Sequence, residues 1–160
     1  MTSTTTRLSV EDRLDIIELT ARYSYHIDRY ELEPLLELWT EDAVFDERPL
    51  GLYYAVGIDK IREFFEHDYK VSSAHVHYMT NHILEAVSET EARGTCCGLV
   101  QADLHNGAVI HATVNYTDEY VKRDGRWLFK SRVVRPFCKI DLGAISTALD
   151  EQIAGAVDKE

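Results

Sequence analysis

Four long segments of β-type sequence fill the second half of the chain, and they restrict the possible folds more than any other feature. We predict strands at about 75–87, 92–104, 108–123 and 126–140, separated by the polar turns Ser88-Glu-Thr, His105-Asn-Gly and Arg123-Asp-Gly. Asn106-Gly107 and Asp124-Gly125 favour tight hairpins, because these pairs tolerate positive φ angles. Strands joined by such short turns are antiparallel neighbours, so this half of the chain predicts one meandering sheet.

The first half of the chain predicts helices. From Val10 to Ile27 the apolar positions Leu14, Ile17, Ala21 and Ser24/Tyr25 recur at three- and four-residue steps, which is typical of an amphipathic helix with that stripe on the core. Further helices are expected at 32–39 and 58–69, with short strands at 43–46 and 52–56. Helices followed by long antiparallel strands predict an α+β fold, in which a curved sheet wraps against a helical layer.

The length of 160 residues suits a single domain. We expect residues 1–9 to form a flexible N-terminal arm, residues 10–141 to form the folded domain, and residues 142–160 to form a C-terminal helix. The apolar stripe of that last segment would cover the mouth of a pocket or contact a neighbouring subunit; it consists of Ile145, Leu149, Ile153 and Ala156.

The negative charge of the chain argues against nucleic acid as a partner. The formal net charge is −11 at pH 7, whereas nucleic-acid binding relies on clustered Lys and Arg. No apolar run approaches the roughly 20 residues of a membrane helix, and the polar start of the chain lacks the apolar stretch of a secretory signal. We therefore expect a cytoplasmic protein that binds small molecules or copies of itself, and neither nucleic acid nor membrane.

The segment from His75 to His82 opens the first long strand and carries three histidines. Strand alternation would place His75, His77, Met79 and Asn81 on one side, and Tyr78, Thr80 and His82 on the other. A His-x-His pair on a strand is compatible with a metal site if His111 or Asp103 supplies further ligands. No H-E-x-x-H motif or Cys/His cluster supports a metal, so we expect no metal and no cofactor, and the metal site is the less favoured alternative.

Several motifs together resemble the SnoaL-like branch of the nuclear transport factor 2 (NTF2)-like superfamily. Their order and spacing carry the resemblance, which covers about residues 10–140. The motifs are the helix ending Arg22-Tyr23 to Asp28, Leu35-Leu-Glu-Leu-Trp-Thr-Glu-Asp-Ala-Val-Phe-Asp46, Gly57-Ile-Asp-Lys-Ile-Arg-Glu-Phe-Phe65, His77-Tyr-Met-Thr-Asn81 and Tyr120-Val-Lys-Arg-Asp-Gly-Arg-Trp-Leu-Phe-Lys-Ser-Arg132. Relatives in this superfamily include scytalone dehydratase, bile-acid 7α-dehydratase, hexachlorocyclohexane dehydrochlorinase, ketosteroid isomerase and polyketide cyclases.

The resemblance implies an NTF2-like cone, in which the curved antiparallel sheet wraps around the N-terminal helices and encloses an apolar pocket. In the dehydratase and dehydrochlorinase relatives a helix-end Asp orients a strand His, and this pattern carries over to Asp28 and His77 as orienting acid and general base. The phenol of Tyr23 would polarise a carbonyl or assist a departing hydroxyl. The dehydrochlorinase relative has a basic residue near the Trp of its last strand, and Lys130 or Arg132 corresponds to it in this chain. We expect substrate contacts from Tyr54, Phe65, Met79, Asn81, Asp103 and Arg132.

The resemblance therefore predicts a cofactor-independent lyase that acts on a small apolar alicyclic, steroid-like or polyketide-like substrate. Two alternatives stay open. A ketosteroid-isomerase-like or polyketide-cyclase-like enzyme would move a proton without losing a group, and for that role Glu47 lies at the closer spacing to the isomerase base, with Asp46 beside it. A non-catalytic protein of this fold would only bind a small ligand. Relatives also associate through the outer sheet face, so a homodimer or homotrimer is expected.

Overall fold

The computed structural model describes residues 7–137, which form three helices, one short 3-10 helix and six strands. The predicted C-terminal helix at 142–160 lies outside the described residues. The helices are α1 (Val10–Asp28), α2 (Leu32–Leu36), η1 (Arg48–Leu50) and α3 (Ile58–Val71). The strands are β1 (Trp39–Asp46), β2 (Tyr54–Val56), β3 (Ser72–Ala86), β4 (Glu91–Leu104), β5 (Val109–Arg123) and β6 (Arg126–Pro136).

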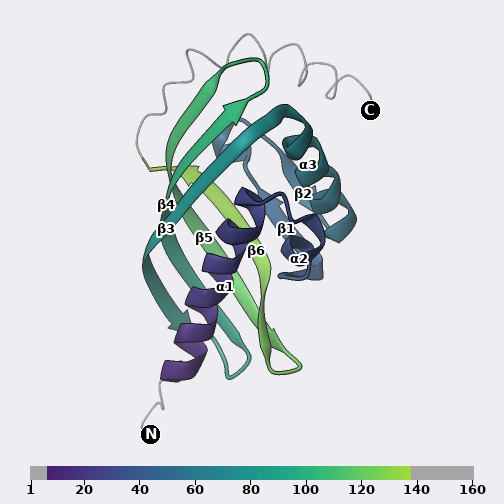
Figure 1. The fold of residues 1–160 in the computed structure, drawn as a ribbon. Helices are drawn as coiled ribbons and strands as arrows, with labels where there is room; N and C mark the ends of the chain where they lie inside the picture. Colours follow the sequence, from purple (N-terminus) through teal and green to yellow (C-terminus); the bar gives the residue numbers. More distant parts are fainter. Residues whose placement is uncertain (1–6, 138–160) are drawn as a thin grey trace, which may run out of the picture.

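The six strands form one sheet in the order β2-β1-β6-β5-β4-β3. The four long strands are an antiparallel meander, as predicted, and β1 joins the sheet parallel to β6. The long strands curve, with α1 lying across one face of the sheet and α2 and α3 beside β1 and β2 (Figure 1). This is the α+β cone with the N-terminal helices held against a curved sheet.

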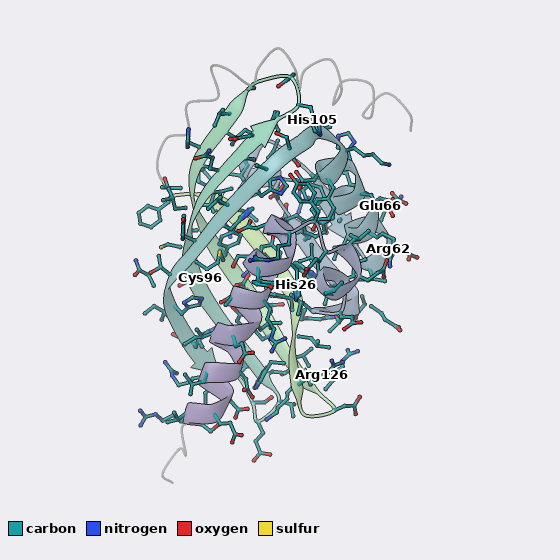
Figure 2. All side chains as sticks on the ribbon, viewed as in Figure 1. His26, Arg62, Glu66, Cys96, His105 and Arg126 are labelled. Atoms are coloured by element: carbon teal, nitrogen blue, oxygen red, sulfur yellow. The ribbon has the colours of Figure 1, made fainter. Side chains whose placement is uncertain are left out.

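The two ends of the sheet are closed by different turns (Figure 2 labels His105 and Arg126 at them). Asp124 and Gly125 both have positive φ, 50° and 78°, and form the predicted two-residue turn between Arg123 and Arg126. At the other end only Gly107 has positive φ, and the amide of Leu104 donates to the carbonyl of Ala108 at 2.8 Å. That loop is one residue longer than a two-residue turn.

The prediction that the apolar stripe of α1 faces the core is wrong. Leu14 is 60% exposed and Tyr25 is 50% exposed, whereas Ile16, Tyr23 and Ile27 are buried. Apolar residues occur on both faces of this helix. The polar Thr20 and Ser24 lie on the buried face, where their hydroxyls donate to carbonyls of the preceding turn. Polarity alone therefore does not mark which face of this helix is buried. The exposed members of the predicted stripe are Leu14, Ile17, Ala21 and Tyr25.

A bulge in β3 overturns part of the predicted face assignment. Between Thr80 and Ile83 the strand gains one residue over β4, and Asn81 there has φ 57°. Beyond the bulge the alternation reverses, so Asn81 is exposed and His82 turns toward α1. The His82 Nε2 and the Thr20 hydroxyl are 2.7 Å apart.

The second helix begins at Leu32 as predicted, but its end and the start of the chain differ from expectation. Trp39 opens β1 instead of ending the helix, and it packs at 4.9 Å between ring centroids against Phe129 of the parallel neighbour β6. Within the segment expected to be a loose arm, Leu8 is buried in the core and the Ser9 side chain caps α1 by accepting from the amide of Asp12 at 2.9 Å. No helix of the described part is long and apolar enough to cross a membrane.

Candidate active site

The last residue of α1 meets the first half of β3 at an acid–imidazole pair. Asp28 Oδ1 lies 2.6 Å from His77 Nδ1, and Asp28 Oδ2 accepts from the backbone amide of His77 at 3.0 Å. Two contacts from one carboxylate fix both the position of the strand and the orientation of the ring. The His77 side chain is 8% exposed and that of Asp28 is 19% exposed, so protein shields the pair without sealing it.

The carboxylate determines which nitrogen of His77 carries a proton. An ionised carboxylate only accepts, so Nδ1 must donate and Nε2 of the neutral ring keeps its lone pair. Among residues 7–137, Nε2 of His77 has no hydrogen-bond partner, and this nitrogen is open to solvent. The pair therefore presents an oriented proton acceptor to any molecule that reaches it.

A second histidine, His75, packs edge-on against the ring of His77. His75 is buried, its ring centroid is 5.9 Å from that of His77, and its Nε2 is 3.4 Å from an oxygen of Asp68 on α3. The ring of Tyr30 stacks on His75 at 5.2 Å and 7°. Tyr30 has φ 59°, a region that costs a non-glycine residue about 1 kcal/mol or more. The strained backbone is held where it places an aromatic ring over His75.

Two acids face the same region. Burial raises the pKa of Asp68, against the opposing effect of His75 and His77. Burial likewise raises the pKa of Glu47 to about 8, with repulsion from Asp68 and Asp46 adding to the shift. Glu47 follows directly after β1, and its electric field also acts on Tyr23 and Tyr116.

A buried ion pair lies farther along the interior. Arg132 of β6 donates from Nε and Nη2 to the two oxygens of Asp118 on β5, each at 2.9 Å, and both side chains are 0% exposed. Burial alone would lower the pKa of Arg132, but Asp118 raises it well above its usual range. Nη1 has no hydrogen-bond partner in the described structure. The guanidinium lies 4.3 Å from the ring centre of Tyr23, and burial keeps the phenol protonated by raising its pKa.

Ring contacts connect this ion pair with the histidine pair. Tyr23 is 6.3 Å from Phe65, Phe65 is 6.3 Å from Tyr69, and Tyr69 is 6.3 Å from His75. The side chains of α1, α3 and the sheet crowd the space between these layers (Figure 2). The site is therefore a small set of polar groups in an aromatic interior, which is the composition of a site for an apolar organic ligand.

The structure places the predicted site residues in two groups. Asp28, His77, Tyr23, Phe65 and Arg132 lie in the interior, where the half-buried Met79 also packs against the core. Arg132 rather than Lys130 reaches inside, because Lys130 pairs with Asp42 at the surface.

Three predicted contact residues lie elsewhere. Asn81 is exposed at the bulge. Asp103 flanks the buried Ala102 on β4, so it shares the outer face with Gln101, whose Nε2 donates to it at 2.9 Å. Tyr54 is 44% exposed under the guanidinium of Arg48.

Sequence reasoning missed Asp68 and Asp118, although each leaves a detectable signal. Asp68 follows Ile61 and Phe65 on the apolar stripe of α3, three residues after the second of them. Asp118 interrupts a two-residue alternation of buried positions between Tyr116 and Tyr120. A charged residue on an otherwise apolar face requires a buried partner, which here is a histidine or an arginine.

The metal alternative finds no support in the described residues. Across residues 7–137 no three His, Cys, Asp or Glu side chains are arranged to hold a metal ion. His111 pairs with Gln101 across β4 and β5 and lies on the outer face with Val76, whereas His77 faces inward.

A family model described as a SnoaL-like domain matches residues 8–133. No curated protein sequence matches the chain.

Solved structures with the same fold carry several different names. A proposed aromatic ring hydroxylase from Novosphingobium aromaticivorans is 26% identical with a TM-score of 0.81, covering 84% of this chain and 95% of its own. A proposed scytalone dehydratase from the same organism is 28% identical with a TM-score of 0.76, covering 81% and 86%. A hexachlorocyclohexane dehydrochlorinase from Novosphingobium barchaimii is 24% identical with a TM-score of 0.72, covering 81% and 88%, and this likeness concerns the fold alone.

Proposed function

This chain belongs to the SnoaL-like domain family, and on that basis we propose that it is a cofactor-independent lyase that catalyses β-elimination, as dehydratases and dehydrohalogenases do. His77 is the general base and Asp28 orients it. The substrate is a small apolar alicyclic, steroid-like or polyketide-like molecule. The observation that carries the proposal is the double contact of Asp28 with the ring and the backbone of His77, which leaves Nε2 as an accessible proton acceptor.

The chemistry follows from the charges. Nε2 of His77 removes a proton from a carbon next to an activating carbonyl, and Asp28 stabilises the imidazolium that forms. The electron pair of the broken C–H bond forms the double bond while the leaving group departs from the neighbouring carbon. An oriented base of this kind contributes roughly 10²–10⁴-fold in rate. Tyr23, whose phenol stays protonated, is proposed to hold the carbonyl oxygen as negative charge develops on it.

A proton-transfer isomerase or cyclase is the second candidate. The observation in its favour is Glu47, whose raised pKa gives the interior a second group able to exchange a proton near neutral pH. The fold does not decide between these reactions, since proteins named for hydroxylation, dehydration and dehydrochlorination share it. A pure binding protein is the third candidate, and it would have no use for an oriented base.

The test compares His77, which faces inward from β3, with His111, which faces outward from β5. The probe is 3-hydroxycyclohexanone in heavy water, because loss of water gives a conjugated enone that absorbs in the ultraviolet. We expect His77→Ala to abolish turnover with melting little changed, and His111→Ala, an exposed histidine on the outer face, to retain it. Equal turnover in both variants rejects His77 as the base. Deuterium at C2 of unreacted ketone without enone formation favours the isomerase.

We further propose that the chain forms a homodimer or homotrimer through the outer face of the sheet. Val76, Tyr78 and Leu99 are exposed there by 39%, 64% and 52%, beside a hollow of about 220 Å³ that His111 also lines. Contiguous exposed apolar side chains support an association surface. Light scattering should give the mass of two or three chains, and Tyr78→Asp should shift it toward one. A monomeric wild-type chain would reject this assembly.

A further inference from the structure

The first half of β3 carries a second acid–imidazole pair beside the first. Asp68 Oδ2, from α3, lies 3.4 Å from His75 Nε2. The rings of His75 and His77 meet edge-on, with centroids 5.9 Å apart and planes at 74°. The His75 side chain is 2% exposed, whereas that of Asp68 is 27% exposed. The proposed elimination assigns no task to either member of this second pair.

Both nitrogens of the His75 ring face an oxygen. Nδ1 lies 3.5 Å from the carbonyl of Ile27 in the last turn of α1, and Nε2 faces Asp68. A carbonyl oxygen only accepts, so Nδ1 carries a hydrogen, and a neutral imidazole then has a bare lone pair on Nε2. A lone pair that faces an ionised carboxylate in the protein interior is repelled and leaves both groups unpaired. The contact between Asp68 and His75 therefore needs one proton, placed on the carboxyl group or on Nε2.

Neighbouring side chains hold the His75 ring in this position. Tyr30 stacks on it with centroids 5.2 Å apart and planes at 7°, and the Tyr69 ring lies at 6.3 Å. The hydroxyl of Ser72 donates to the carbonyl of Asp68 at 2.6 Å, which ties the end of α3 to the start of β3. The ring cannot tilt away from its two oxygen neighbours without losing the stacking contact with Tyr30.

The titratable groups around Asp68 come from α1, α3, β3 and the segments that follow α1 and β1. Burial raises the pKa of Asp68, which favours a proton held there, and the neighbouring histidines oppose the shift. No lysine or arginine of the described residues forms an ion pair with Asp68. Without a permanent cation beside it, Asp68 keeps a proton or shares one with His75. The groups that interact electrostatically with Asp68 or with its neighbour Tyr69 are His67, His75, His77, Glu47, Tyr30, Asp28 and Glu31.

We propose that Asp68 and His75 hold a shared proton and act together as a positioning pair for His77. The inference rests on the proposed function, because it assigns the support of the same base. The pair joins α3 to the carbonyl of Ile27, and the next residue of α1 is Asp28, which orients the base. When the shared proton is lost at high pH, the carboxylate and the lone pair of Nε2 repel each other, and this support of the base weakens.

The first test measures the shared proton without turnover. Asp68→Asn offers an amide hydrogen to Nε2 at every pH, and the control Glu66→Gln makes the same change on the exposed side of α3 (Figure 2). An unfolded Asp loses its proton above about pH 4, whereas the folded pair keeps one. The folding equilibrium of wild type relative to Asp68→Asn should therefore fall up to tenfold per pH unit above about pH 4, until the folded pair ionises. A constant ratio would overturn the proposal, and Glu66→Gln should show no comparable slope.

Nitrogen NMR of the imidazoles makes the same test on the wild-type protein, so it does not depend on the folding of a variant. At neutral pH we expect hydrogen on Nδ1 of His75, with Nε2 either protonated or accepting a hydrogen bond. A bare Nδ1 with hydrogen on Nε2 would overturn the shared proton, because the lone pair would then face the carbonyl of Ile27.

The second test asks whether the pair positions the base, and it follows kcat and KM for 3-hydroxycyclohexanone against pH. As the pair loses its proton, wild-type kcat should fall by up to roughly 10²-fold with KM little changed, since a small displacement of a positioned group costs that much. Glu66→Gln should keep this alkaline decline and Asp68→Asn should lose it. A decline shared by all three proteins would overturn the positioning role. A wild type without turnover would reject the proposed elimination and the positioning role with it, while the folding ratio still decides whether the pair holds its proton.

Discussion

Asp28 binds His77 twice, through the imidazole Nδ1 at 2.6 Å and through the backbone amide at 3.0 Å. The two residues are 49 positions apart in the chain, so this contact joins the end of α1 to the sheet at the same point at which it orients the ring. Structure and chemistry therefore depend on one carboxylate. Replacing one carboxylate oxygen of Asp28 by an amide nitrogen separates the contact with the ring from the contact with the backbone.

Asp28→Asn should keep the fold and lose the chemistry. An amide nitrogen in place of an oxygen no longer accepts from Nδ1, so the proton moves to Nε2 and the base is lost. We expect turnover of 3-hydroxycyclohexanone to fall roughly 10²–10⁴-fold, and nitrogen NMR of the imidazole to show the changed tautomer. Glu31→Gln is the control, because Glu31 contacts His26 Nδ1 at a similar 2.7 Å on the far side of the helix end. An unchanged tautomer in Asp28→Asn contradicts the orienting role.

Asn81 tests the bulge separately from the site. Its φ of 57° is costly for a branched residue, so Asn81→Val should lower the free energy of unfolding by about 1–3 kcal/mol, and Asn81→Gly should be close to neutral. Because Asn81 is exposed, the glycine variant should keep wild-type turnover. Urea unfolding with both variants measures the difference, and a loss of turnover in Asn81→Gly would restore the residue to the substrate-binding set.

Asp118→Asn should destabilise the protein strongly. The substitution leaves the guanidinium of Arg132 buried without a counter-charge, which typically costs 3–5 kcal/mol. Lys130→Ala removes a surface ion pair from the same strand and should cost under about 1 kcal/mol. Denaturant unfolding of the two variants gives the comparison. Similar losses would mean that the interior pair is not desolvated.

The lowered pKa of Asp12 predicts that the protein loses stability in acid. Hydrogen bonds from Lys122, the Ser9 hydroxyl and the Trp127 indole lower the pKa of Asp12 to about 2, so they stabilise the folded state in full above the unfolded pKa near 4. The contribution is lost as the pH falls from about 4 toward 2, because the folded carboxylate then also takes up a proton. Wild type should lose more stability than Asp12→Asn over that interval in urea titrations, and parallel curves would contradict the assignment.

The sequence alone determined the elements that depend on local backbone preference. Alternation and turn residues located the four long strands and the Asp124-Gly125 hairpin, and the helix spans agree closely for α1 and α3. The order of motifs identified the family and the pair Asp28 and His77. The strands, the hairpin and the helices are readable because each is specified by residues close together in the chain, whereas the pair came only from the resemblance to the family.

Only the tertiary structure decided which side chains share the interior. One inserted residue at Asn81 reversed the face of His82, and the outward turn of Asp103 follows from the register that buries Ala102. The contact between Asp68 and His75 joins two elements whose relative placement is set by the packing of α3 against a curved sheet. Curvature and register are properties of the whole sheet, and a one-residue shift moves a side chain to the other face, so local pattern cannot fix them.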